Sequence, residues 1–107
     1  MKIKTSDLKG KALDWATAVA DGMSINFLKR NPYAAPEYSR SWDKCGELID
    51  RFAPSFFYAE GKYGCEFSVV DCMHIADSFQ EALCRCAVTF LLGREVDVPD
   101  ELVGDDE

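Results

Sequence analysis

The sequence MKIKTSDLKGKALDWATAVADG, residues 1–22, contains the signals that decide the fold. Its first four residues predict a short extended segment, and the Thr-Ser-Asp triplet that follows supplies three side chains able to cap a helix. Apolar residues then recur at helical spacing around Trp15, and Gly22 is placed to end the helix in a left-handed conformation. We therefore expect a core-facing amphipathic helix that begins between Ser6 and Gly10, with Trp15 at the centre of the core.

The next part of the chain predicts one irregular connection and one helix. Met23–Arg40 contains two prolines and many polar residues, which favour a long loop. Ser41 then precedes apolar residues at helical spacing, which predict a helix of about ten residues that ends before Pro54. We expect the apolar face of this second helix to pack against the first helix.

A hairpin and a third helix are predicted after Pro54. Residues 55–70, SFFYAEGKYGCEFSVV, place β-favouring residues on either side of Glu60–Lys62, as in two antiparallel strands joined by a turn. Asp77, with Gln80 three positions later, has the spacing of a capping box, and Gly93 is expected to end the helix that follows. The predicted apolar stripe of this helix comprises Phe79, Leu83, Cys86, Ala87, Phe90 and Leu91.

Length and composition predict one α+β domain, in which three helices pack with a short antiparallel hairpin. A chain of 107 residues with 48% hydrophobic content can bury a core of its own. We expect the domain to span residues 1–103, with Val96 and Val98 in a short extended strap, and residues 104–107 to form a frayed acidic terminus. Because no apolar run reaches the roughly 18 residues of a membrane span and the start lacks signal-peptide features, we expect a cytoplasmic monomer or homodimer without membrane contact.

The acidic charge is concentrated at one end of the chain. The formal net charge is −7, and seven of the 19 acidic residues lie within residues 94–107. The remainder is nearly neutral, which disfavours direct binding of nucleic acid, because such binding depends on clustered Lys and Arg. An acidic surface at this end could instead imitate nucleic-acid phosphates toward a basic groove. The residues concerned are Glu95, Asp97, Asp100 and Glu101.

The cysteines and the single histidine indicate no specific catalytic or metal chemistry. Five cysteines are an odd number for a protein expected in a reducing compartment, so we expect free thiols rather than disulfides. Cys72 and His74 form the only cluster with ligand and nucleophile residue types, but the paired C-x-x-C or H-x-x-x-H spacing of zinc sites is missing. Cys84 and Cys86 would point about 200° apart on a helix and could not share an ion. With no glycine-rich phosphate loop, we expect no metal, no cofactor and no catalytic residues.

Aromatic and arginine side chains near the middle of the chain are the best candidates for a contact surface, because these residue types dominate binding hot spots. The alternative is that the rings fold down over the core and the arginines stay in water. The candidate partner-binding residues are Tyr33, Tyr38, Arg40, Trp42, Phe56 and Tyr58.

Three segments together carry a family resemblance: KTSDLKGKALDWATAVADG at 4–22, YSRSWDKCGELID at 38–50, and ALCRCAVTFLLGREVDVPDEL at 82–102. They resemble the NinX-like family of small proteins encoded by tailed phages and prophages of enteric bacteria; residues 55–71 are the weakest part of the likeness. The resemblance implies a phage accessory protein, in a family without an established activity or assigned catalytic residues.

We therefore expect a non-catalytic protein that binds a host or phage protein, including as an inhibitor of host defence. Two alternatives stay open. One is an acidic nucleic-acid mimic that blocks a DNA- or RNA-binding host protein, as an anti-CRISPR protein does. The other is a small Cys/His enzyme or metal protein.

Overall fold

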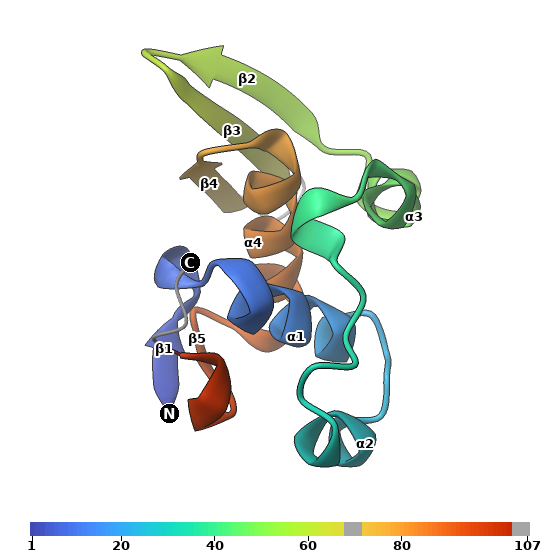
Figure 1. Ribbon diagram of the computed structural model, residues 1–107. Coiled ribbons are helices and arrows are strands. Elements are labelled where there is room, and N and C mark those ends of the chain that lie inside the picture. Colours follow the sequence, from blue (N-terminus) through green and yellow to red (C-terminus); the bar gives the residue numbers. More distant parts are fainter. Residues whose placement is uncertain (68–71, 104–107) are drawn as a thin grey trace.

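Helix α4 (Phe79–Leu92) lies at the centre of the computed structural model, which describes residues 1–67 and 72–103 (Figure 1). Helix α1 (Gly10–Ala20) packs against one side of α4, and a three-stranded sheet packs against the other. Several buried side chains of α4 are small, which allows α1 and the sheet to approach the α4 backbone closely. The buried residues of α4 are Ala82, Leu83, Cys84, Cys86, Ala87 and Val88.

The predicted first helix is confirmed, but its capping triplet has another role. Thr5–Asp7 forms a separate 3-10 turn, η1, and no side chain caps the N-terminus of α1. The hydroxyl of Thr5 instead donates a hydrogen bond of 2.7 Å to the carbonyl of Gly93, just beyond α4. Trp15 is buried as expected, and its indole N–H donates to the carbonyl of Leu28 at 3.1 Å. This triplet therefore ties the start of α1 to the end of α4.

The expectation of one long loop between residues 23 and 40 is wrong. A short helix α2 (Ile25–Arg30) forms there, because Ser24 caps it by accepting a hydrogen bond from the Phe27 N–H. Gly22, with a φ of 102°, ends α1 as predicted and turns the chain toward this helix. A 3-10 turn η2 (Tyr38–Arg40) follows at the end of the segment.

Helix α3 (Trp42–Phe52) is confirmed, and it is capped by Ser41, whose hydroxyl accepts from the Lys44 N–H. Its predicted neighbour is wrong: α3 packs mainly against α4 and η2 instead of α1. The reason is that the turn η2 contacts both helices. On the side of α1, the Ser39 N–H of η2 donates to the Asp14 carboxylate at 2.8 Å.

The predicted hairpin forms, with an additional third strand. Strands β2 (Ser55–Ala59), β3 (Lys62–Phe67) and β4 (Cys72–Ala76) make an antiparallel sheet in the order β2-β3-β4. Glu60 and Gly61 both have positive φ, which is the backbone of a tight two-residue hairpin turn. Residues 68–70, which the sequence assigned to the hairpin, lie outside the described residues.

A second, two-stranded sheet joins segments from opposite ends of the chain. Strand β1 (Lys2–Lys4) pairs antiparallel with β5 (Glu95–Asp97), and a 3-10 turn η4 (Asp100–Leu102) follows (Figure 1). Val96 and Val98 are buried, which confirms the predicted strap. The expected frayed terminus, residues 104–107, lies outside the described residues.

Two predictions for α4 are corrected. The cap is Ser78, whose hydroxyl accepts from the Glu81 N–H at 3.2 Å, whereas Asp77 and Gln80 were predicted. Phe90 and Leu91 were assigned to the core, but they are 45% and 36% exposed; the Phe90 ring contacts Phe52 edge to face and covers the core only in part. Gly93 ends the helix as expected.

The described residues form one compact domain of helices and antiparallel sheets, with four α-helices and two sheets where three helices and one hairpin were predicted. No helix within residues 1–67 and 72–103 is long and apolar enough to cross a membrane.

Candidate functional site

Four aromatic rings from three elements form a partly exposed surface, which we call the hairpin aromatic cluster. It consists of Phe56 and Tyr58 on β2, Tyr63 on β3 and Phe79 on α4. Phe79 is central, with its ring centroid 5.3 Å from that of Phe56 and 4.8 Å from that of Tyr63, both edge to face. Tyr58 extends the series, 4.9 Å from Tyr63. These are distances at which aromatic pairs attract.

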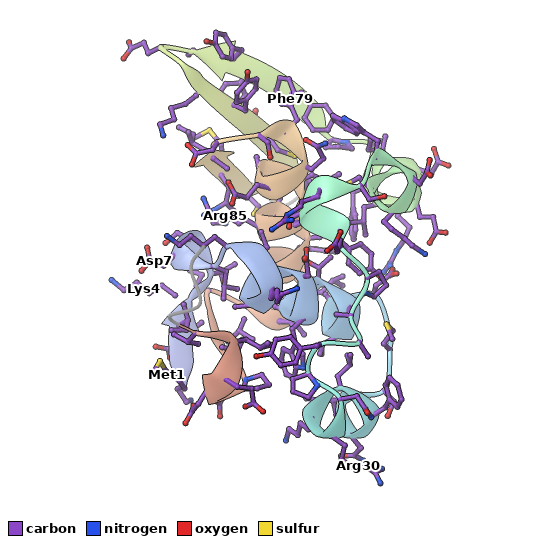
Figure 2. The ribbon with its side chains drawn as sticks, viewed as in Figure 1. Met1, Lys4, Asp7, Arg30, Phe79 and Arg85 are labelled. Carbon is purple, nitrogen blue, oxygen red and sulfur yellow. The ribbon has the colours of Figure 1, made fainter. Side chains whose placement is uncertain are left out.

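The strand register explains why these rings meet. Tyr58 and Tyr63 are direct cross-strand partners, and Phe56 lies two residues before Tyr58, on the same face of β2. Phe79 is the first residue of α4 and lies beside the hairpin strands (Figure 2). Tyr58 is the outermost ring, and 60% of its surface is exposed. The cluster therefore combines a packed interior with an exposed aromatic edge.

Tyr38, predicted to contact a partner, is buried, and this prediction is corrected. Its hydroxyl donates to the Asp21 carboxylate at 3.0 Å, and burial together with that carboxylate raises the pKa of the phenol. Arg51 pairs with the other oxygen of Asp21 at 2.8 Å. Tyr38 thus links η2 to the end of α1 and is not available to a partner.

The other predicted contact residues are exposed but separate from the cluster. The Tyr33 hydroxyl donates to the carbonyl of Glu101, and the Lys11 ammonium lies 5.8 Å from the Tyr33 ring centroid. Trp42 is exposed in the first turn of α3, and Arg40 borders a cleft on another part of the surface. Of the six predicted residues, the structure therefore joins only Phe56 and Tyr58.

The predicted acidic surface is partly neutralised. Asp97 and Asp100 both accept from the amino group of Met1, at 2.8 and 3.0 Å. The β1–β5 register places Lys4 opposite Glu95 and Lys2 opposite Asp97. Opposite charges thus face most of the acids in this strap.

Cys72 and His74 lie on one face of β4, and each forms its hydrogen bond with a residue of α4. The His74 Nε2 is 2.7 Å from the Thr89 hydroxyl, while the Cys72 thiol donates to the Cys86 carbonyl at 3.8 Å. Burial raises the pKa of Cys72 to about 11, whereas a thiolate nucleophile requires a lowered value. Burial, assisted by the charges of Arg85 and Arg94, lowers the pKa of His74.

The five cysteines are all buried as free thiols, on two sides of α4. The Cys86 thiol donates to the Cys65 carbonyl at 3.1 Å, on the side of the sheet. On the other side, the Cys45 thiol and burial raise the pKa of Cys84. In the part of the chain that the structure describes, no three His, Cys, Asp or Glu residues could hold a metal ion together.

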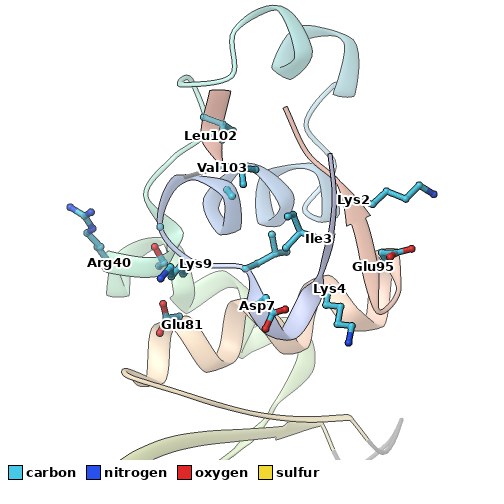
Figure 3. A pocket seen from close by; sticks show the side chains of 14 residues that line it. Lys2, Ile3, Lys4, Asp7, Lys9, Arg40, Glu81, Glu95, Leu102 and Val103 are labelled. Carbon is cyan, nitrogen blue, oxygen red and sulfur yellow. The ribbon is translucent and has the colours of Figure 1, made fainter. Parts of the chain in front are cut away.

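The sequence did not indicate a cleft of about 820 Å³, which is lined by residues of the N-terminal segment and by residues from later elements, among them Arg40, Glu81 and Leu102 (Figure 3). Ile3 and Leu102 contribute apolar walls, and charges of both signs surround them. Figure 3 shows Lys9 and Glu81 on one side and Lys4 on the other. The Lys-Ile-Lys sequence at residues 2–4 indicates a strand with one apolar and two charged side chains. The position of this strand beside the cleft follows only from its pairing with β5.

The sequence matches no protein-family model and no curated protein.

Proposed function

We propose that this protein is a phage- or prophage-encoded accessory protein that acts in the host cytoplasm without catalysis, by binding a host or phage protein through the hairpin aromatic cluster. The observation that carries the proposal is the exposed aromatic edge formed by Tyr58 and Phe56. Aromatic anchors with a packed base are typical of binding hot spots, because they bury large apolar areas with little loss of side-chain freedom.

The proposed class of partner is a protein with an apolar pocket, into which the Tyr58 ring would insert. Blocking a host defence protein in this way would account for a phage origin without requiring catalytic residues.

The test is a comparison of Tyr58→Ala with Tyr33→Ala. Both tyrosines are similarly exposed, at 60% and 58%, but Tyr33 lies outside the cluster. A partner captured from infected cells is identified and its affinity for purified variants is measured by calorimetry. We expect Tyr58→Ala to cost about 2 kcal/mol of binding free energy, as hot-spot residues do, and Tyr33→Ala to cost little. Equal effects of the two substitutions would refute the assignment of this surface.

Acidic mimicry is the weaker alternative, because Lys2, Lys4 and the Met1 amino group already oppose the strap. Removing residues 95–107 would not test it cleanly, since Val96 and Val98 are part of the core. Glu101→Gln with Asp100→Asn leaves the core intact. Mimicry predicts that this pair of changes weakens binding of a basic partner and that salt weakens it further.

A further inference from the structure

The three-stranded sheet has one face that α4 does not cover. Side chains alternate between the two faces of each strand, and Cys65, Phe67 and Cys72 mark the face buried against α4. The residues between them point the other way. We call this side the outer sheet face, and its main residues are Phe57, Lys62, Gly64, Glu66, Met73 and Ile75.

The centre of the outer sheet face is apolar. Met73 and Ile75 are 56% and 48% exposed, and the Phe57 ring lies directly over Gly64, where a Cβ atom would overlap it. An antiparallel sheet with one face in water ordinarily carries polar residues on that face. An exposed apolar centre on such a sheet indicates a surface that becomes covered.

The face is more available for contact than the edge of β4. The Arg85 guanidinium donates to the carbonyl of Ile75 at 3.1 Å and, through Nε, to the carbonyl of Leu8 at 2.8 Å. Arg85 therefore occupies a hydrogen-bonding position that an added strand would need along this edge. Stacking on the face leaves these two bonds in place.

The charges of the face are self-complementary. Lys62 and Glu66 lie on the same side of β3, one on each side of Gly64. A two-fold axis parallel to the sheet, along the row formed by Phe57, Gly64 and Ile75, reverses the strand direction. It brings Lys62 of one copy opposite Glu66 of the other, twice, and sets Ile75 against its own counterpart.

We propose that two copies of this chain associate through their outer sheet faces, with the apolar centres in contact and two Lys62–Glu66 pairs at the ends. Packed sheets lie about 10 Å apart, a distance that two long charged side chains span. The Lys62–Asp77 pair within each copy is exposed on both sides and can exchange for this contact at little cost. This surface lies on the opposite side of the sheet from the ring of Tyr58, so the inference is independent of the proposed function.

The oligomeric state of the purified full chain tests the proposal. Sedimentation velocity and light scattering over a concentration series should show native protein shifting from the 12.0 kDa chain mass to twice that value. Ile75→Lys places two ammonium groups against each other on the axis, so the dimer dissociation constant should rise at least about tenfold. Ile25→Lys is the matched control, since Ile25 is 43% exposed on α2, and it should leave the dimer unchanged.

Charge exchange provides the second measurement. Glu66→Lys alone should weaken the dimer, and the combination Lys62→Glu with Glu66→Lys should restore it, with circular dichroism confirming that each variant is folded. The proposal is overturned if native protein stays at the chain mass at all concentrations. It is equally overturned if the dimer survives Ile75→Lys, or if the double exchange is no tighter than Glu66→Lys.

Discussion

Asp14 is the one charged side chain that is buried among the described residues. It lies in α1 and accepts a hydrogen bond from the Ser39 N–H, which fixes η2 against that helix. Burial raises the pKa of its carboxyl, more than the hydrogen bonds from Ser39 lower it. The charge of Asp14 therefore opposes folding at neutral pH, while its oxygen holds the turn in place.

Substitutions at Asp14 should separate these two effects. Asp14→Ala leaves the Ser39 N–H without a partner and should lower the free energy of unfolding by about 1–3 kcal/mol. Asp14→Asn keeps an acceptor and removes the charge, so it should be the more stable of the two. Urea unfolding monitored by fluorescence measures both.

The pH dependence gives a further check on Asp14. Because the folded-state pKa is raised, the native carboxyl favours folding below its ordinary pKa and loses that contribution as the pH rises through the folded-state value. The stability of Asp14→Asn relative to native protein should thus increase between about pH 3 and about pH 7. A constant difference would contradict the assigned role of burial.

Residue identity alone could not predict the candidate site. Tyr38 and Trp42 are four positions apart and were assigned the same role, yet Tyr38 is buried and Trp42 is exposed. The difference comes from Asp21, which accepts from the Tyr38 hydroxyl across 17 residues of sequence. Phe79 was assigned to the core, and its contact with Phe56 and Tyr63 depends on where α4 meets the hairpin.

At the scale of elements, the helices and turns whose formation depends on neighbouring residues could be predicted from the sequence. Ser41 and the turn at Glu60–Gly61 act within a few residues, and α3 and the hairpin form as expected. Helix α2 was missed because it has only six residues in a segment with many polar residues, and strand β4 was missed because its sequence, CMHIA, lacks the aromatic residues that marked the hairpin strands. Their stability comes from burial against other elements, which the sequence does not display.

The start of α4 offers a direct comparison between the predicted and the observed cap. The Ser78 hydroxyl accepts from the Glu81 N–H, and the Glu81 carboxylate accepts from the Asp77 N–H at 3.1 Å. Ser78→Ala should lower the free energy of unfolding by about 0.5–2 kcal/mol. Gln80→Ala should change it by much less, because the Gln80 side chain is not part of the cap. Thermal unfolding followed by circular dichroism decides between them, and the reverse order would restore the original assignment.

At the scale of the whole molecule, the position of α4 between α1 and the sheet protects every thiol. All five cysteines are buried, and burial contributes to the raised pKa values of Cys72, Cys84 and Cys86. The predicted opposite orientation of Cys84 and Cys86 is confirmed by their partners, Cys45 on one side and Cys65 on the other. Helical spacing indicated the angle between the Cys84 and Cys86 side chains, but it could not indicate which elements lie on each side of α4.

A chromogenic disulfide reagent should therefore react with native protein only as fast as the chain unfolds. We expect all five thiols to react at one common rate that increases with denaturant. Ser55→Cys adds a thiol at an exposed position and should react at once, which verifies the reagent. Rapid reaction of a native cysteine would contradict the central packing of α4.

The pairing of β1 with β5 has a consequence for synthesis. Ile3 is synthesised 93 residues before its partner Val96. Helix α1, which contains the buried Trp15, likewise lacks its main packing partner until α4 has been synthesised. The Trp15 side chain must consequently stay exposed while the residues between α1 and α4 are synthesised. Contacts between residues so far apart in sequence also slow folding, because closing a long loop costs conformational entropy. The domain is therefore expected to close only after residues 95–97 have been synthesised, with chaperones that bind apolar segments acting on the earlier part until then.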